Sequence, residues 1–220
     1  MNQSVRGIAR VATAGLRALL VLTLVCGVIY PLVVTGIAQA LFHDKANGSE
    51  VKDDGQVVGS RLIGQHFDLK DAKDKDGNPL PDPKWFQPRP SAAGANVYNT
   101  RYSIVVSGAS NLAADSKVLK ETVIARRNAV AAFNGVPQSE VPVDALTASG
   151  SGIDPHISPD YADIQVARVA RENGLSRAAV QKLVDRHTDG RIAGFLGEPH
   201  VNVLELNVAV RDLAAGERGD

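Results

Sequence analysis

The stretch from Thr147 to Gly174 contains the side chains that come nearest to a catalytic set. Asp154 and His156 lie two residues apart, where a carboxylate can orient an imidazole for general-base chemistry or supply half of a metal site. Ser149 and Ser151 precede them in the same turn-rich sequence. These four residues form the candidate functional loop.

The sequence lacks further residues that either general-base catalysis or a metal site would need. A metal site needs three or four ligands, and His66, His187 and His200 are dispersed along the chain. We therefore predict neither a catalytic residue nor a metal ligand. The favoured interpretation is a tightly turned loop whose polar groups satisfy its own backbone.

Motifs for nucleotide, serine or calcium chemistry are incomplete elsewhere. The sequence has no phosphate-binding loop lysine, and neither Ser107 nor Ser110 lies in a G-x-S-x-G motif, so helix capping is the simpler explanation for both serines. A calcium loop centred on Gly77 would place Ala72 and Pro83 where acids are required. The polar stretch 68–84 is therefore predicted to be a solvated loop.

Helix signals surround the candidate loop. Ser158 as N-cap and Pro159 at the first position predict a helix to Asn173, ended by Gly174, and Ser176 caps a second, shorter one. Apolar residues at helical spacing predict another helix over 115–133, with Arg126, Arg127 and Asn128 on its solvent face.

Strand signals lie on either side. Residues 56–67 read as one or two short strands broken by Gly59 and Gly64, and the alternation from Val201 to Val210 predicts a strand with one buried face. Residues 103–112 resemble a strand that turns into a helix. Because strands and helices interleave without a strict rhythm, we predict a compact mixed α/β (α+β) soluble domain.

The longest apolar run, Ala18–Phe42, has 25 residues without a charged side chain or histidine. A helix of that length spans about 37 Å, which exceeds the ~30 Å hydrocarbon core of a bilayer. We predict a single transmembrane helix, kinked where Pro31 cannot bond the carbonyl of Gly27. A cleaved signal peptide ending near Ala38-Gln39-Ala40 is the alternative, but the run is longer than such segments.

Small and polar residues recur every fourth position of this span. Contact with lipid alone does not explain such a ridge. Small residues permit another helix to approach closely, and polar residues can form hydrogen bonds to it. The alternative is that single-span anchors tolerate scattered Gly and Thr. The candidate interface consists of Thr23, Gly27, Pro31, Thr35 and Gln39.

Charge and cysteine content exclude several classes of partner and site. After Phe42 there are 21 basic and 24 acidic side chains, a formal charge of −3, so neither nucleic acid nor an anionic lipid surface is indicated as partner. The only cysteine, Cys26, lies in the span, so no disulfide or cysteine metal site forms within one chain.

Basic residues near the span indicate its orientation. Arg6, Arg10 and Arg17 precede it without any acid, whereas Lys45 and Lys52 follow it among acids. We therefore expect a cytoplasmic tail (1–17), a transmembrane helix (18–42) and an extracytoplasmic domain (43–220).

Taken together, several stretches resemble the KdpC family, the C subunit of the Kdp potassium-transporting P-type ATPase. They are YPL in the span, VVGSRLIGQ, RPSA from Arg89, SGASNL, TASGSGIDPHIS, and LGEPHVNVLELN. The resemblance covers nearly the whole chain, and its last two motifs are long and specific. SGASNL departs from the family at Ala109, where Gly is common, and the charged residues 70–83 resemble an extended variable loop.

The resemblance implies a non-catalytic subunit in the inner or plasma membrane. Its implied partners are a channel-like potassium-binding subunit and an ATP-hydrolysing subunit, whose ATP affinity it raises as a catalytic chaperone. The orientation above excludes direct ATP contact, so ATP would be bound only through the partner. The alternatives are an extracytoplasmic cap over the potassium entrance, an anchored enzyme using Asp154 and His156, or, if the domain is cytoplasmic, a module that binds ATP directly.

Overall fold

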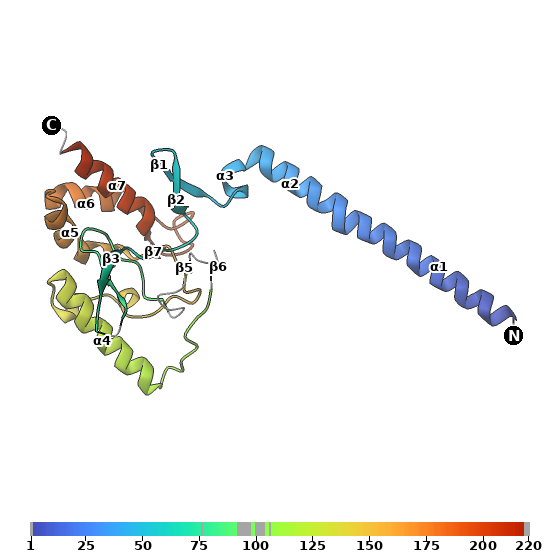
Figure 1. The fold of residues 1–220 in the computed structure, drawn as a ribbon, viewed down its shortest axis with the longest axis horizontal. Helices are drawn as coiled ribbons and strands as arrows, with labels where there is room; N and C mark the ends of the chain where they lie inside the picture. The colour runs from blue at the N-terminus through green and yellow to red at the C-terminus, as the bar shows by residue number, and fades with distance from the viewer. Residues whose placement is uncertain (1, 76, 92–97, 100–103, 106, 218–220) are drawn as a thin grey trace. The chain divides into compact units, whose positions relative to one another are not determined.

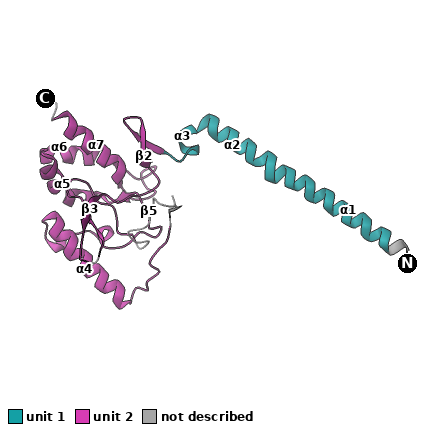
Figure 2. Cartoon of the chain, viewed as in Figure 1, with its two compact units in different colours: residues 1–49 teal, residues 50–220 magenta. Residues whose placement is uncertain are grey.

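The computed structural model describes residues 2–75, 77–91, 98–99, 104–105 and 107–217. The chain divides into two compact units, residues 1–49 and residues 50–220 (Figure 2). Ala92, the last residue of the RPSA motif, lies outside the described residues.

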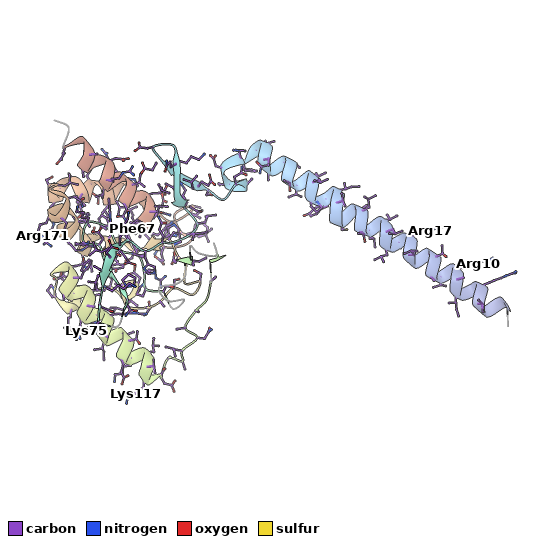
Figure 3. The ribbon with its side chains drawn as sticks, in the orientation of Figure 1. Arg10, Arg17, Phe67, Lys75, Lys117 and Arg171 are labelled. Carbon is purple, nitrogen blue, oxygen red and sulfur yellow. The ribbon has the colours of Figure 1, made fainter. Side chains whose placement is uncertain are left out.

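The first unit is one long helix followed by a short one. Helix α1 (Asn2–Leu24) passes through a π-helical turn η1 (Val25–Ile29) into α2 (Tyr30–Leu41), and α3 (His43–Ala46) follows (Figure 1). Val5–Leu41 is long and apolar enough to cross a membrane, which fits a membrane-anchored subunit. Arg10 and Arg17 project near its N-terminal end (Figure 3).

The kink predicted at Pro31 stays a prediction, but directly before Pro31 the helix leaves α-helical geometry in the π-helical turn η1. Pro31 has no N–H to donate to the Gly27 carbonyl, and directly before it the N–H of Tyr30 donates to the carbonyl of Val25, five residues back. The prolyl position is thus accommodated within a continuous helical path.

The second unit is a mixed α/β domain of small antiparallel sheets and four longer helices. Hairpins form between β1 (Glu50–Asp53) and β2 (Gln56–Ser60), β3 (Asp68–Lys73) and β4 (Pro79–Pro81), and β5 (Tyr98–Asn99) and β6 (Ile104–Val105). A three-stranded sheet has the order β7-β9-β8, from β7 (His156–Ile157), β9 (His200–Asn202) and β8 (Thr188–Asp189). The helices are α4 (Lys117–Asn134), α5 (Pro159–Asn173), α6 (Arg177–Arg186) and α7 (Val203–Gly216), with 3-10 turns at Gln138–Glu140 and Val143–Ala145.

The core lies where α5 meets α4, α6 and β9. Aliphatic side chains fill most of it, and Phe86, fully buried, contributes its large aromatic ring. Burying an aliphatic or Phe side chain contributes about 1.5–3 kcal/mol, so this cluster accounts for much of the domain's stability. Its fully or nearly fully buried aliphatic members include Val166, Val169, Val180, Val184, Val201, Leu206 and Val210.

The helices predicted over 159–173, after Ser176 and over 115–133 are confirmed, although the last of these begins at Lys117. Ser158 accepts a hydrogen bond from the N–H of Tyr161, and Gly174 has the left-handed backbone (φ +71°) that ends α5. Ser176 caps α6 in the same manner, and Ser116 caps α4. Arg126 was wrongly expected on the solvent face of α4, because it donates to the carbonyl of Leu146.

The strand predicted from Val201 to Val210 is wrong beyond Asn202. Residues 203–216 form helix α7, capped by the Asn202 side chain, which accepts from the N–H of Glu205. Leu204, Leu206, Val208 and Val210 do alternate, but Val203, Leu206, Val210 and Ala214 recur at helical spacing and are buried. An Asn followed three residues later by Glu was the signal of a helix start.

Three further predictions need correction. Residues 68–84 include the β3–β4 hairpin rather than a wholly solvated loop, because Asp74 accepts a hydrogen bond from the N–H of Asn78 and closes the turn. Gly59 lies inside β2 and does not break it. Ser107 and Ser110 do not cap a helix, since α4 begins after Ser116.

Candidate functional site

The candidate loop, residues 147–158, is held by its own side chains. The hydroxyl oxygen of Ser149 accepts from the N–H of Gly152 at 2.8 Å, and that of Ser151 accepts from the N–H of Ile153 at 3.2 Å. Oδ1 of Asp154 accepts from the N–H of His156 at 3.0 Å. At these three positions the prediction that polar groups satisfy the loop backbone is confirmed.

An arginine from a distant segment also binds the loop. Nη1 of Arg89 donates to Oδ2 of Asp154 at 3.0 Å, and both side chains are about a quarter exposed. Nη2 of Arg89 donates to the Thr147 carbonyl at 3.5 Å, and the N–H of Ser149 donates to the carbonyl of Pro90. Residues 89–90 therefore bind both the start of the candidate loop, at Thr147 and Ser149, and its acidic residue Asp154.

The surroundings of Asp154 keep its carboxylate charged. Burial acts to raise the pKa of Asp154, but the side-chain and backbone hydrogen bonds from His156, together with the charge of Arg89, hold that pKa below its usual value. Both carboxylate oxygens have protein partners. A carboxylate engaged in this way is a structural anchor more than a free base.

His156 has a neighbour that the sequence did not predict. Its ring packs edge-to-face on that of His200, with ring centroids 4.4 Å apart, so the expectation that the histidines are dispersed is wrong for this pair. Nδ1 of His156 lies 3.5 Å from Oδ1 of Asp154, and Nδ1 of His200 lies 3.0 Å from the Glu198 carbonyl. In the part of the chain that the structure describes, no three His, Cys, Asp or Glu side chains are grouped to hold a metal.

Two more sequence motifs meet the loop. The N–H of Gly64 donates to the carbonyl of Ile153 at 2.8 Å, and a Cβ at Gly64 would lie 2.3 Å from the carbonyl oxygen of Asp154. The side chain of Asn202 donates to the carbonyl of Arg61. Segments 59–64, 89–90 and 198–202 thus converge on residues 147–158.

A buried arginine fixes the segment that leads to Arg89. Arg168, only 1% exposed, donates to Asn134, to Gln165 and to the backbone carbonyls of Pro83 and Trp85. Its guanidinium also lies over the ring of Phe133, 4.4 Å from the ring centroid. Burial lowers the pKa of Arg168 to about 10, so the side chain remains charged at neutral pH.

Side-chain amides continue this support. Asn207 accepts from the N–H of Phe86 at 2.8 Å and donates to its carbonyl at 3.0 Å, and Gln165 pairs with both backbone groups of Gln87. The two amides act as the partner strand that this extended segment lacks. Sequence patterns did not predict this role, because a buried Asn or Gln in a helix carries no periodic signal.

A surface cavity of about 240 Å³ lies beside this network. Its lining includes Arg211 and Asp53, which form an ion pair, together with aromatic and aliphatic side chains. The lining residues are Asp53, Val58, Gln65, Phe67, Trp85, Leu204, Asn207, Val208 and Arg211.

The candidate ridge lies on the first unit. Thr23, Gly27, Pro31 and Thr35 are exposed, whereas the amide of Gln39 exchanges hydrogen bonds with that of Asn47 at 3.1 and 3.2 Å. Gln39 therefore already has a partner within the chain. The ridge remains a prediction, with Thr23 and Thr35 as its exposed polar groups.

The comparisons with known proteins agree along the whole chain. A model of the family described as KdpC, "K+-transporting ATPase, c chain", matches residues 12–212. A Streptomyces avermitilis protein named "Potassium-transporting ATPase KdpC subunit" is 56% identical over 98% of this chain and 99% of its own. Proteins with the same name from Streptomyces coelicolor (55%, all of both chains) and Kineococcus radiotolerans (50%, 97% of this chain and all of its own) are also similar.

Proposed function

This chain belongs to the KdpC family of K⁺-transporting ATPase subunits, and we propose that it serves there as a non-catalytic, membrane-anchored accessory subunit. The observation that carries the proposal is the extent of the family match, because residues 12–212 cover most of the apolar helix and most of the soluble unit.

The proposed partners are the potassium-binding, channel-like subunit and the ATP-hydrolysing subunit of the same complex. The three arginines before the span support an N-terminus in the cytoplasm and a soluble unit outside the plasma membrane. In this arrangement the proposed increase in ATP affinity is a coupling free energy, transmitted through the partner chains without contact between this chain and ATP.

The geometry of the candidate loop supports a structural role for its residues. Asp154 is bound by Arg89 and by the backbone of His156, and the two serines hold the loop's own N–H groups. An anchored enzyme would instead need a base free to accept a proton from a substrate. We therefore place catalysis in the ATP-hydrolysing partner.

Assembly through the span is tested by replacing Gly27 and Thr35 with Leu. Added side chains on the ridge should block close helix approach, so the yield of copurified partner chains should fall. Replacing Val25 and Val33, which are exposed on the opposite side of the same helix, with Leu is the matched control. Equal yields from both variants would rule out the ridge as an interface.

The enzyme alternative is tested by His156→Ala in the intact complex. Full potassium uptake at low external potassium, with normal assembly, is the expected result. A complex that assembles normally but no longer transports would show that His156 has an essential chemical role and would contradict the proposal.

A further inference from the structure

Two histidine side chains, one of them in the candidate loop, meet on the three-stranded sheet. His156 lies in β7 and His200 in β9, two strands that pair antiparallel, and the ring centroids are 4.4 Å apart with the ring planes at 79°. The His156 side chain is 36% exposed, and His200 is half-buried. Neither imidazole takes part in the proposed function, although solvent reaches both.

The neighbours of the two Nδ1 atoms determine where the ring protons lie. Nδ1 of His200 lies 3.0 Å from the carbonyl oxygen of Glu198, and Nδ1 of His156 lies 3.5 Å from Oδ1 of Asp154. A carbonyl and a carboxylate can only accept, so each neutral ring carries its proton on Nδ1 and its lone pair on Nε2. Among the residues that the structure describes, neither Nε2 atom has a hydrogen-bond partner.

Histidines that bind late transition metals have the same arrangement. A metal-binding imidazole donates its second N–H to a carboxylate or to a backbone carbonyl, and both kinds of acceptor occur here. Two nitrogen atoms that share one tetrahedral ion at about 2.0–2.1 Å lie about 3.3 Å apart. Rings with centroids 4.4 Å apart can reach this separation through small rotations, because the Cβ–Cγ torsion of histidine is broad.

We propose that Nε2 of His156 and Nε2 of His200 together bind one divalent late transition-metal ion, of the class of Ni²⁺, Cu²⁺ and Zn²⁺. In the described part of the chain no third His, Cys, Asp or Glu is grouped with the pair, so water completes the coordination. The carboxylate of Asp154 is bound by Arg89 and acts behind the ligand His156, not as a ligand itself.

Ligand chemistry separates this site from the transport of potassium. Imidazole nitrogen suits nickel, copper and zinc, whereas K⁺ and Mg²⁺ take oxygen ligands. Affinity should therefore be highest for Cu²⁺, lower for Ni²⁺ and Zn²⁺, and absent for Mg²⁺. A bound ion links β7 to β9 and stabilises the sheet, and it takes no part in potassium uptake.

Titration of the purified full chain with NiCl₂ tests the site. The parent chain for this experiment carries Cys26→Ser and no polyhistidine tag, so neither a thiol nor added imidazoles compete. Calorimetry should find one Ni²⁺ per parent chain. His156→Ala and His200→Ala should each weaken binding by roughly a hundredfold, because the second ligand of a chelate acts at a high effective concentration.

His187→Ala is the matched control. Nδ1 of His187 lies 2.8 Å from the carbonyl oxygen of Leu183, so its ring has the same tautomer, but no second imidazole is paired with it in the described part of the chain. This variant should bind Ni²⁺ as tightly as the parent chain. If the parent chain binds no Ni²⁺, or if it binds no more tightly than His156→Ala or His200→Ala, the proposal is wrong.

Thermal unfolding keeps the test decisive if an alanine weakens the fold, because each chain is compared with its own metal-free midpoint. At ten times the dissociation constant, Ni²⁺ should raise the midpoint of the parent chain by about 3–6 °C. The rise should persist in His187→Ala and be absent from His156→Ala and His200→Ala at the same concentration. An equal rise in all four chains would show that Ni²⁺ binds elsewhere and would overturn the proposal.

Discussion

Arg89 and Asp154 lie 65 positions apart in the chain, yet Nη1 of one donates to Oδ2 of the other at 3.0 Å. This pair joins the extended segment after β4 to the loop before α5. The N–H of Gly64 donates to the carbonyl of Ile153 in the same loop, and the ring of His156 packs on that of His200. The contact between Arg89 and Asp154 therefore lies where segments 59–64, 89–90 and 198–202 meet.

The first prediction concerns the strength of this pair. Arg89→Ala should lower the free energy of unfolding by about 1.5–3 kcal/mol, because a partly buried carboxylate loses a charged donor. Unfolding of the full chain in detergent can be followed by the fluorescence of Trp85, the only tryptophan. In a double-mutant cycle with Asp154→Asn, the two losses should not add; simple additivity would show that the residues do not interact.

The second prediction is the pH dependence of the same contact. The pKa of Asp154 is lowered in the folded chain, so its stabilising contribution is complete above the unfolded value of about 3.9 and is lost as pH falls through the lower folded pKa. The stability difference between wild type and Asp154→Asn should therefore be constant near neutral pH and shrink below about pH 4. A difference that is unchanged down to pH 2 would contradict this assignment.

The third prediction concerns close backbone approach at Gly64. Gly64→Ala should destabilise the fold by about 1–3 kcal/mol, since its Cβ would lie 2.3 Å from the Asp154 carbonyl oxygen, which is backbone and cannot rotate away. Gly150→Ala, in the candidate loop itself, is the matched control, because its Cβ would meet nothing within 4 Å. Equal thermal unfolding of the two variants would argue against the tight contact.

The fourth prediction concerns the amide support beneath the site. Asn207→Ala leaves the buried N–H and carbonyl of Phe86 without their partner, so we expect a loss of about 3 kcal/mol in unfolding free energy. Asn128→Ala, on the exposed face of α4, should change stability by less than about 0.5 kcal/mol. Similar losses for both substitutions would mean that the Asn207 bonds contribute little.

The local parts of the fold were predictable because local chemistry determines them. Ser158, Pro159 and Gly174 marked α5 correctly, since caps act within one turn of a helix. The prediction of a strand through Leu204 to Val210 was wrong, because both strand alternation and helical spacing fit so short an apolar run. Only packing against the core decides between the two structures.

The site was only partly predictable for a related reason. The candidate loop and its self-bonding followed from Ser149, Ser151 and Asp154, whose partners lie two or three residues away. The partners of Arg89 and His200 were not predicted because they are distant in sequence. An arginine between two prolines was a usable signal, whereas nothing near His200 indicated its approach to His156.

The central claim is that the soluble unit lies outside the cytoplasm and so acts on ATP hydrolysis only through its partner chains. The most direct test labels Lys117→Cys in a Cys26→Ser chain with a membrane-impermeant maleimide, because Lys117 begins α4 and its side chain is 88% exposed (Figure 3). We predict labelling in intact cells carrying the assembled complex. Labelling only after the membrane is permeabilised would place the unit in the cytoplasm and contradict the account.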